Sequence, residues 1–131
     1  MPRPVHFEIH ATDPNALREF YEKVFDWRFQ QWGDVPYWLI STASSDGSQA
    51  PGIDGGLVPR RGAPPEDGQP VNAFVLTVDV PDCAAYVERA VEAGASVALP
   101  RHATPGVGWL AYVKDPDGNL IGLMQNDPTA S

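Results

Sequence analysis

The chain has 131 residues, 43% of them hydrophobic, which is enough apolar material for one small domain with its own core. A formal net charge of -8 excludes a phosphate backbone as the expected partner, and the single cysteine, Cys83, excludes an intramolecular disulfide. The N-terminal residues lack an apolar leader and no apolar run reaches the ~20 residues of a membrane span, so we expect a soluble cytoplasmic protein without a membrane or nucleic-acid partner.

The first half of the chain predicts a strand, a helix and three further strands. Residues 5–11 place apolar side chains at odd positions and polar ones at even positions, as in a strand with two distinct faces. Asp13 and Pro14 predict the start of a helix, whose apolar stripe is Leu17, Phe20, Tyr21 and Val24. The remaining strands are expected over residues 26–32, 37–42 and 53–58.

The second half repeats this plan after a proline- and glycine-rich segment that predicts a linker. A strand is expected over residues 72–79 and a helix over 81–93, with Gly94 as its left-handed stop. Strands are then expected over residues 95–99, 109–114 and 119–125, with a loop over 100–108 and an Asp-Pro-Asp-Gly turn at 115–118. The prediction is one domain with modules at residues 4–59 and 71–127 and a linker at 60–70.

A single shift along the chain aligns the two halves. It places His6 on Asn72, Asp13 on Asp79, and the Gly-Leu-Val segment that begins at Gly56 on the Gly-Leu-Met segment that begins at Gly122. The match is one of pattern, with slight identity, so chance similarity of two stretches is the alternative.

Several segments in this arrangement resemble the vicinal-oxygen-chelate superfamily of glyoxalases, bleomycin-resistance proteins and extradiol dioxygenases. They are VHFEIHATDP at residues 5–14, FYEKVFDW at 20–27, VDV at 78–80 and KDPDGN at 114–119. The resemblance implies an α+β fold of two βαβββ modules, whose curled mixed sheet forms a cup for a small ligand while the helices cover its outside. It also implies a homodimer.

The resemblance places metal ligands of the enzymes on the first and last strands of each module. The corresponding positions here are His6, Gly56, Asn72 and Gly122. Only His6 is a good ligand, because glycine has no side chain and an amide oxygen suits calcium better than zinc or iron. We therefore expect no cofactor at the standard position, with a divalent metal as the alternative that stays open.

A displaced metal site is one form of that alternative. His6 and His10 lie roughly 13 Å apart at ~3.3 Å per strand residue, too far to share one ion. His6, Glu8 and Asp54 could share one. The other interpretation of these side chains is a hydrogen-bonded or solvated polar patch.

The expected ligand pocket combines polar side chains of the first half with mostly apolar ones of the second. Its predicted lining residues are His6, Glu8, His10, Asp54, Asn72, Phe74, Leu120, Gly122 and Met124. The glycines at 56 and 122 are expected to leave room for the ligand. Aromatic residues either wall the mouth or belong to the core or a dimer interface, and these are Tyr37, Trp38, Trp109 and Tyr112. Glu8 is the candidate general acid or base, with His10 beside it.

Three functions remain open from the sequence. The first is the binding of a small organic metabolite, aromatic or not, without the standard metal site. The second is catalysis as a lyase, isomerase or oxygenase, with a displaced metal or with metal-free acid/base residues. The third is a structural or regulatory partner of a larger enzyme.

Overall fold

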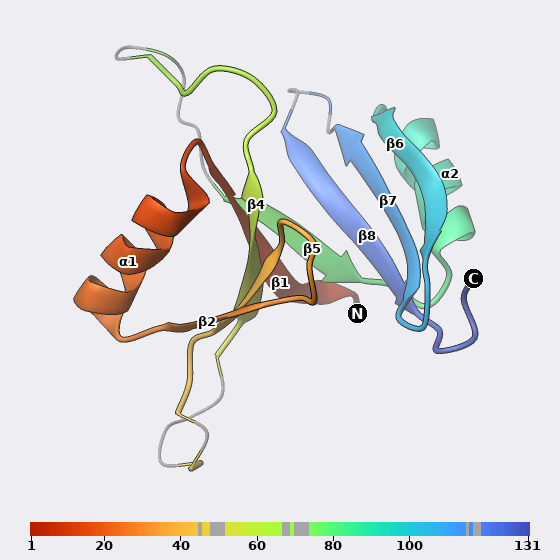
Figure 1. The fold of residues 1–131 in the computed structure, drawn as a ribbon. Coiled ribbons are helices and arrows are strands. Elements are labelled where there is room, and N and C mark those ends of the chain that lie inside the picture. Colours follow the sequence, from red (N-terminus) through yellow and green to blue (C-terminus); the bar gives the residue numbers. More distant parts are fainter. Residues whose placement is uncertain (45, 48–51, 67–68, 70–73, 115, 117–118) are drawn as a thin grey trace. The chain divides into compact units, whose positions relative to one another are not determined.

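The computed structural model describes residues 1–131 except 45, 48–51, 67–68, 70–73, 115 and 117–118. Its elements follow the order β-α-β-β-β twice, so the predicted α+β fold of two βαβββ modules is confirmed (Figure 1). The chain divides into two compact units. The first unit is residues 6–74, and the second unit is residues 75–131 together with residues 1–5. No helix among the described residues is long and apolar enough to cross a membrane.

The first unit is a four-stranded sheet with one helix. Its elements are β1 (Arg3–Ala11), α1 (Pro14–Phe25), β2 (Arg28–Gln31), β3 (Trp38–Ser41) and β4 (Asp54–Pro59), and the strand order is β2-β3-β4-β1. β1 pairs with β4 in parallel, whereas the other neighbours are antiparallel. The parallel pair is possible because α1 supplies the crossover connection.

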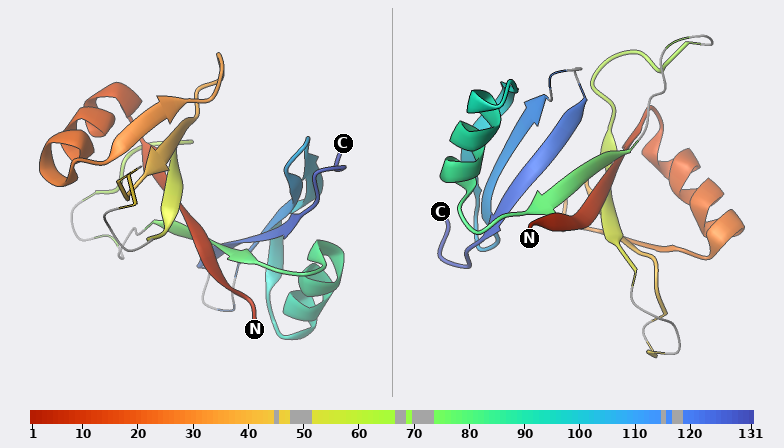
Figure 2. Two further views of the ribbon diagram at one scale, coloured as in Figure 1. Left: turned by 90° about the horizontal axis from the view of Figure 1, so that it is seen from below. Right: turned by 180° about the vertical axis from the view of Figure 1, so that it is seen from behind.

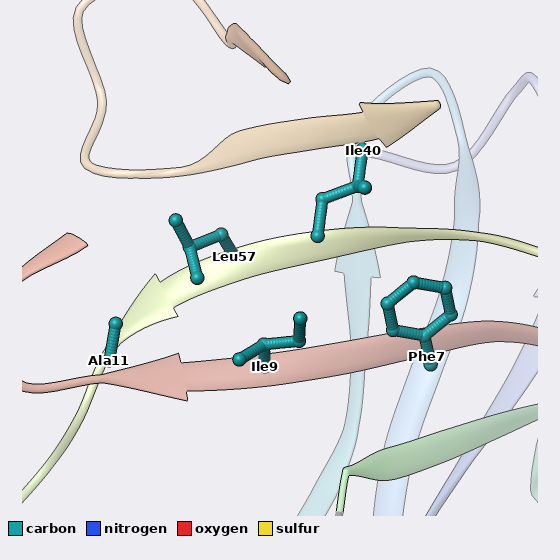
Figure 3. Packing of buried hydrophobic residues seen from close by; sticks show 5 residues of the cluster. All are labelled: Phe7, Ile9, Ala11, Ile40 and Leu57. Atoms are coloured by element: carbon teal, nitrogen blue, oxygen red, sulfur yellow. The ribbon is translucent and has the colours of Figure 1, made fainter. Parts of the chain in front are cut away.

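The predicted alternation of β1 sets the core of this unit. Phe7, Ile9 and Ala11 are buried and pack with Ile40 of β3 and Leu57 of β4 (Figure 3). Side chains of α1 pack against this cluster, and they include the predicted stripe residues Leu17 and Tyr21. Asp13 caps α1 as predicted, since its carboxylate accepts a hydrogen bond from the Ala16 N–H at 3.2 Å.

The second unit repeats the same topology. Its elements are β5 (Val75–Asp79), α2 (Cys83–Glu92), β6 (Ser96–Thr104), β7 (Gly108–Lys114) and β8 (Leu120–Asn126), and the strand order is β5-β8-β7-β6 (Figure 2). Its buried core consists of Val80, Cys83, Ala111, Val113 and Leu123. The loop predicted over residues 100–108 is wrong in its first half, because β6 continues to pair with β7 as far as Thr104.

The register that relates the two halves differs from the prediction. Asp82, not Asp79, caps α2 as Asp13 caps α1. The glycines at the last strands remain equivalent, yet Gly56 pairs with Glu8 while Gly122 pairs with Thr77. The second module is therefore three residues shorter between its helix start and its last strand, and no single shift aligns both ends.

This register changes one predicted position. The counterpart of His6 is Val75 rather than Asn72, because Thr77 is the counterpart of Glu8. Asn72 itself lies outside the described residues.

Candidate functional site

One face of the first unit's sheet carries polar side chains, and we call it the polar face. It holds the even residues of β1, namely His6, Glu8 and His10, on the side opposite Phe7 and Ile9. Parallel partners in register share a face, so Asp54 lies beside His6 and Gly56 lies beside Glu8. Four of the predicted pocket residues are thus brought together on this unit: His6, Glu8, His10 and Asp54.

His6 is held by a tyrosine from the segment that precedes β3. The hydroxyl oxygen of Tyr37 lies 3.1 Å from Nε2 of His6, within hydrogen-bonding distance. Burial lowers the pKa of His6 below its ordinary value, although the charges of Glu8 and Asp54 oppose this shift. Burial, with a contribution from the Glu8 charge, raises the pKa of Tyr37 to about 12. Both effects favour a neutral imidazole bonded to a neutral phenol.

Gly56 makes room for that tyrosine. A Cβ atom built on Gly56 would collide with Oη and Cζ of Tyr37 and would lie 2.9 Å from its Cε2. Diagonal neighbours on adjacent strands are within reach of an aromatic side chain, which explains how Tyr37 covers a glycine whose direct partner on β3 is Leu39. The prediction that Gly56 leaves open space for a ligand is therefore wrong, because the protein's own phenol occupies it.

Glu8 and His10 form the next pair along β1. Oε1 of Glu8 lies 3.8 Å from Nε2 of His10, and their side chains are 15% and 35% exposed. This distance exceeds that of a hydrogen bond, and Nε2 of His10 is buried without a hydrogen-bond partner in the described part of the chain. A carboxylate and an imidazole at this separation can exchange a proton through one bound molecule.

Asp54 is already engaged by its own unit. Its carboxylate accepts hydrogen bonds from the Thr42 N–H at 2.9 Å and from the Thr42 hydroxyl at 3.2 Å. Among the residues that the structure describes, no three His, Cys, Asp or Glu side chains are grouped so as to hold a metal ion. The displaced site of His6, Glu8 and Asp54 is thus not assembled in this arrangement.

The second unit closes its glycine in the same way. A Cβ atom on Gly122 would lie 2.9 Å from the Thr77 hydroxyl and 3.1 Å from Cε1 of Tyr112, which is its direct partner on β7. Met124 pairs with Asp79, and Leu120 pairs with Lys114. The expectation that Gly122 leaves room for a ligand is wrong, because the Thr77 hydroxyl and the Tyr112 ring already occupy the space beside it.

Phe74 does not belong to the polar face. Its ring stacks on Phe7 at a centroid distance of 5.7 Å, on the helix side of the first unit. The prediction grouped Phe74 with Gly122 because it relied on the single shift, which the structure corrects. On β5, Thr77 and Asp79 pair with Gly122 and Met124 instead.

The four aromatic residues considered for the mouth, the core or a dimer interface divide into two kinds. Trp38 packs against the core of the first unit and Trp109 against the core of the second. Nε1 of Trp109 also donates a hydrogen bond to Asp127 at 3.0 Å, so both tryptophans serve packing. Tyr37 and Tyr112 instead cover the two glycines.

The residues at the family's ligand positions do not fit a metal ion. His6 is the one imidazole, and the structural counterparts at the other three positions are Gly56, Val75 and Gly122. Neither glycine position can accept a larger side chain without displacing a tyrosine or threonine. A single imidazole whose ring nitrogen faces a phenol does not make a transition-metal site.

A hollow of about 500 Å³ lies on the second unit. Residues of its lining include Asp79, Pro81, Tyr86 and Gln125. It contains none of the predicted site residues and no histidine. We place the candidate site on the polar face because two pairs of titratable groups lie close together there, His6 and Tyr37 at 3.1 Å and Glu8 and His10 at 3.8 Å.

Sequence reasoning missed the role of Tyr37. It left open whether this residue walls the mouth, packs in the core or lies at a dimer interface, whereas its hydroxyl is a member of the site. The available signal was the glycine on the neighbouring strand, because a glycine in a strand indicates close approach of another group.

Comparison with known proteins supports this fold. A model of the Glyoxalase/Bleomycin resistance protein/Dioxygenase superfamily matches residues 3–123. The putative glyoxylases CFP32 of Mycobacterium bovis and Mycobacterium tuberculosis are 27% identical over 124 residues, which is 93% of this chain and 45% of theirs. The chain thus spans somewhat less than half the length of these relatives.

Two solved structures show the same fold at lower identity. A glyoxalase/bleomycin resistance protein/dioxygenase superfamily member from Vibrio splendidus is 20% identical with a TM-score of 0.66, over 97% of this chain and 100% of that one. Methylmalonyl-CoA epimerase from Streptomyces coelicolor is 21% identical with a TM-score of 0.58, over 98% and 97%. With the family model matching residues 3–123, the chain belongs to the Glyoxalase/Bleomycin resistance protein/Dioxygenase superfamily.

Proposed function

We propose that this chain binds a small organic metabolite at the polar face of its first unit, without a metal at the family's standard position. The observation that carries the proposal is the covered carboxylate of Glu8, flanked on its strand by His6 and His10. Burying polar and ionisable side chains costs stability, so a row of them on one strand is more readily explained by a ligand than by packing.

The charges of this face favour a particular kind of ligand. Glu8 and Asp54 lie on neighbouring strands, and their negative charges oppose the lowering of the His6 pKa that burial causes. A carboxylate accepts hydrogen bonds from hydroxyl and amine groups but repels another anion. The proposed ligand is therefore uncharged or cationic, with hydroxyl or amine donors directed at Glu8.

A panel of small polyols, phenols, amines and carboxylates tests the proposal. Compounds that raise the melting temperature would be measured by isothermal titration calorimetry on the wild type, Glu8→Gln and the control Glu19→Gln, whose side chain is exposed on α1. A lost hydrogen bond to a charged group is worth about 1.5–3 kcal/mol, so Glu8→Gln should weaken binding about tenfold or more.

The control variant should bind as the wild type does. The proposal is wrong if every bound compound retains its affinity in Glu8→Gln, or if the bound compounds are all carboxylates.

The second candidate is a lyase, isomerase or oxygenase. The separation of 3.8 Å between Glu8 and His10 supports metal-free acid/base work on a carbon-bound proton. Bound compounds incubated with the protein in D₂O would then exchange that proton for deuterium, which NMR detects. Exchange that vanishes in Glu8→Gln while binding persists would favour this enzyme over a binding protein.

The proposal includes a cytoplasmic homodimer. Phe20 and Val24, one turn apart on α1, are 52% exposed, as is typical of a surface that another chain covers. Light scattering on the purified chain should give twice the mass of 14.2 kDa. A mass of one chain at micromolar concentration would contradict the dimer but not the ligand site.

A further inference from the structure

We propose that Tyr37 determines which class of ligand the polar face binds. Its side chain fills the space that a metal-binding carboxylate at position 56 would need, and its hydroxyl contacts His6. The polar face of this unit therefore offers hydrogen-bonding groups in place of a set of metal ligands. This deepens the proposed function and rests on it for the organic ligand. The part of the inference that concerns metal ions stands on the geometry around Gly56 alone.

The phenol ring and the hydroxyl group have separate effects. The ring carbon Cζ and the hydroxyl oxygen occupy the space into which any side chain at position 56 would project. The hydroxyl lies 3.1 Å from Nε2 of His6 and thereby engages one of the two ring nitrogens through which an imidazole binds a metal. A carboxylate at position 56 and the observed His6 contact are thus mutually exclusive while Tyr37 keeps its place.

The second unit supplies an independent instance. Gly122 is also covered by a tyrosine from the neighbouring strand, Tyr112, together with the Thr77 hydroxyl. Both last-strand positions that would carry family ligands therefore lack a side chain, and both are closed by groups of the chain itself. Each unit thus closes the glycine position on its own last strand with its own side chains, which leaves no room there for a metal-binding carboxylate.

Nickel binding tests the inference with the full chain. Isothermal titration calorimetry with Ni²⁺ alone would compare the wild type, Tyr37→Phe, Tyr37→Ala and the double variant Tyr37→Ala/Gly56→Glu. The double variant removes the phenol and adds a carboxylate beside Glu8 and diagonally across from His6, which makes three ligands of suitable chemistry. It should bind Ni²⁺ at least tenfold more tightly than the other three proteins, and adding His6→Asn should abolish the gain.

Two results would overturn the inference. One is tight binding of Ni²⁺ by the wild type that His6→Asn abolishes. The other is a double variant that keeps the wild-type circular dichroism spectrum and gains no affinity for Ni²⁺.

A second measurement covers the case in which the double variant does not fold. In two-bond ¹H–¹⁵N spectra, the Nε2 resonance of His6 should shift between the wild type and the conservative variant Tyr37→Phe, which retains the ring and loses the hydroxyl. An unshifted Nε2 resonance would overturn the inference. Neither measurement uses an organic ligand, so failure of the compound panel would refute the proposed function without affecting this result.

Discussion

Gly56→Ala is the substitution whose effect the structure defines most closely. The backbone of Gly56 does not require glycine, since its φ lies outside the left-handed region, so the glycine serves only the contact with Tyr37. The added methyl group would force the ring aside. This loses the hydrogen bond to His6, worth about 1 kcal/mol, and re-exposes part of the ring, worth about another 1 kcal/mol for roughly 40 Å².

The net effect is smaller than this sum. Alanine restricts the unfolded chain more than glycine does, which returns about 0.5 kcal/mol at a position with an ordinary backbone conformation. The free energy of unfolding of Gly56→Ala should therefore be lower by about 1.5 kcal/mol. In the background of Tyr37→Ala there is no ring to displace, so the same substitution should be neutral or should stabilise by about 0.5 kcal/mol.

Urea denaturation of the wild type, both single variants and the double variant measures the coupling, expected at about 2 kcal/mol. Gly55→Ala is the matched control. Its Cβ would lie 2.6 Å from the backbone carbonyl oxygen of Phe7, which Tyr37→Ala cannot move, so this variant should be more destabilised and uncoupled from Tyr37. Additive effects of Gly56→Ala and Tyr37→Ala would refute the reasoning.

Three further outcomes are expected. The pKa of His6 in the folded protein is below its ordinary value of 6.5, so the unfolded chain takes up the proton first as the pH falls. Urea denaturation should therefore show a stability that decreases as the pH drops below 6.5. His6→Asn should lessen that decrease. The pKa of Tyr37 is raised from 10.0 to about 12, so stability should fall as the pH rises from 10 through 12, and a pH series with Tyr37→Phe should lack that loss. In Gly108→Ala, the added Cβ would collide with the carbonyl oxygen of Gln125 on the paired strand. Thermal denaturation should show a free energy of unfolding lower by more than about 3 kcal/mol, or no folded protein. A stable variant would contradict the pairing of β7 with β8.

The sequence was sufficient for the order of the elements and for the core side of β1. Strict alternation in β1 gave the two faces of the strand, and the Asp-Pro pair gave the start of α1, because both depend on neighbours close in the chain. The βαβββ repeat followed from the same local patterns.

The register between the modules did not follow, because it depends on pairings distant in the chain. Asp79 and Asp82 both precede the second helix, and only the capping hydrogen bond to the Ala85 N–H identifies Asp82 as the counterpart of Asp13. The sequence alignment matched Asp13 with Asp79, and it therefore assigned Asn72 instead of Val75 as the counterpart of His6. For the same reason it placed Phe74 on the wrong face.

The role of Tyr37 was also beyond the sequence. A glycine in a strand indicates that another group approaches closely, but that group can be a ligand, a backbone segment or a side chain. Only the three-dimensional placement of Tyr37 over Gly56, with its hydroxyl at His6, distinguishes a closed position from an open one.

The most direct test of the account is a crystal structure with the tightest-binding compound of the panel, collected with anomalous data at the nickel edge after soaking in Ni²⁺. The account predicts a donor atom of the compound within ~3.2 Å of the Glu8 carboxylate, with Tyr37 still over Gly56 and no anomalous peak at His6. A compound seated in the hollow beside Tyr86, or a nickel ion on Nε2 of His6, would contradict it.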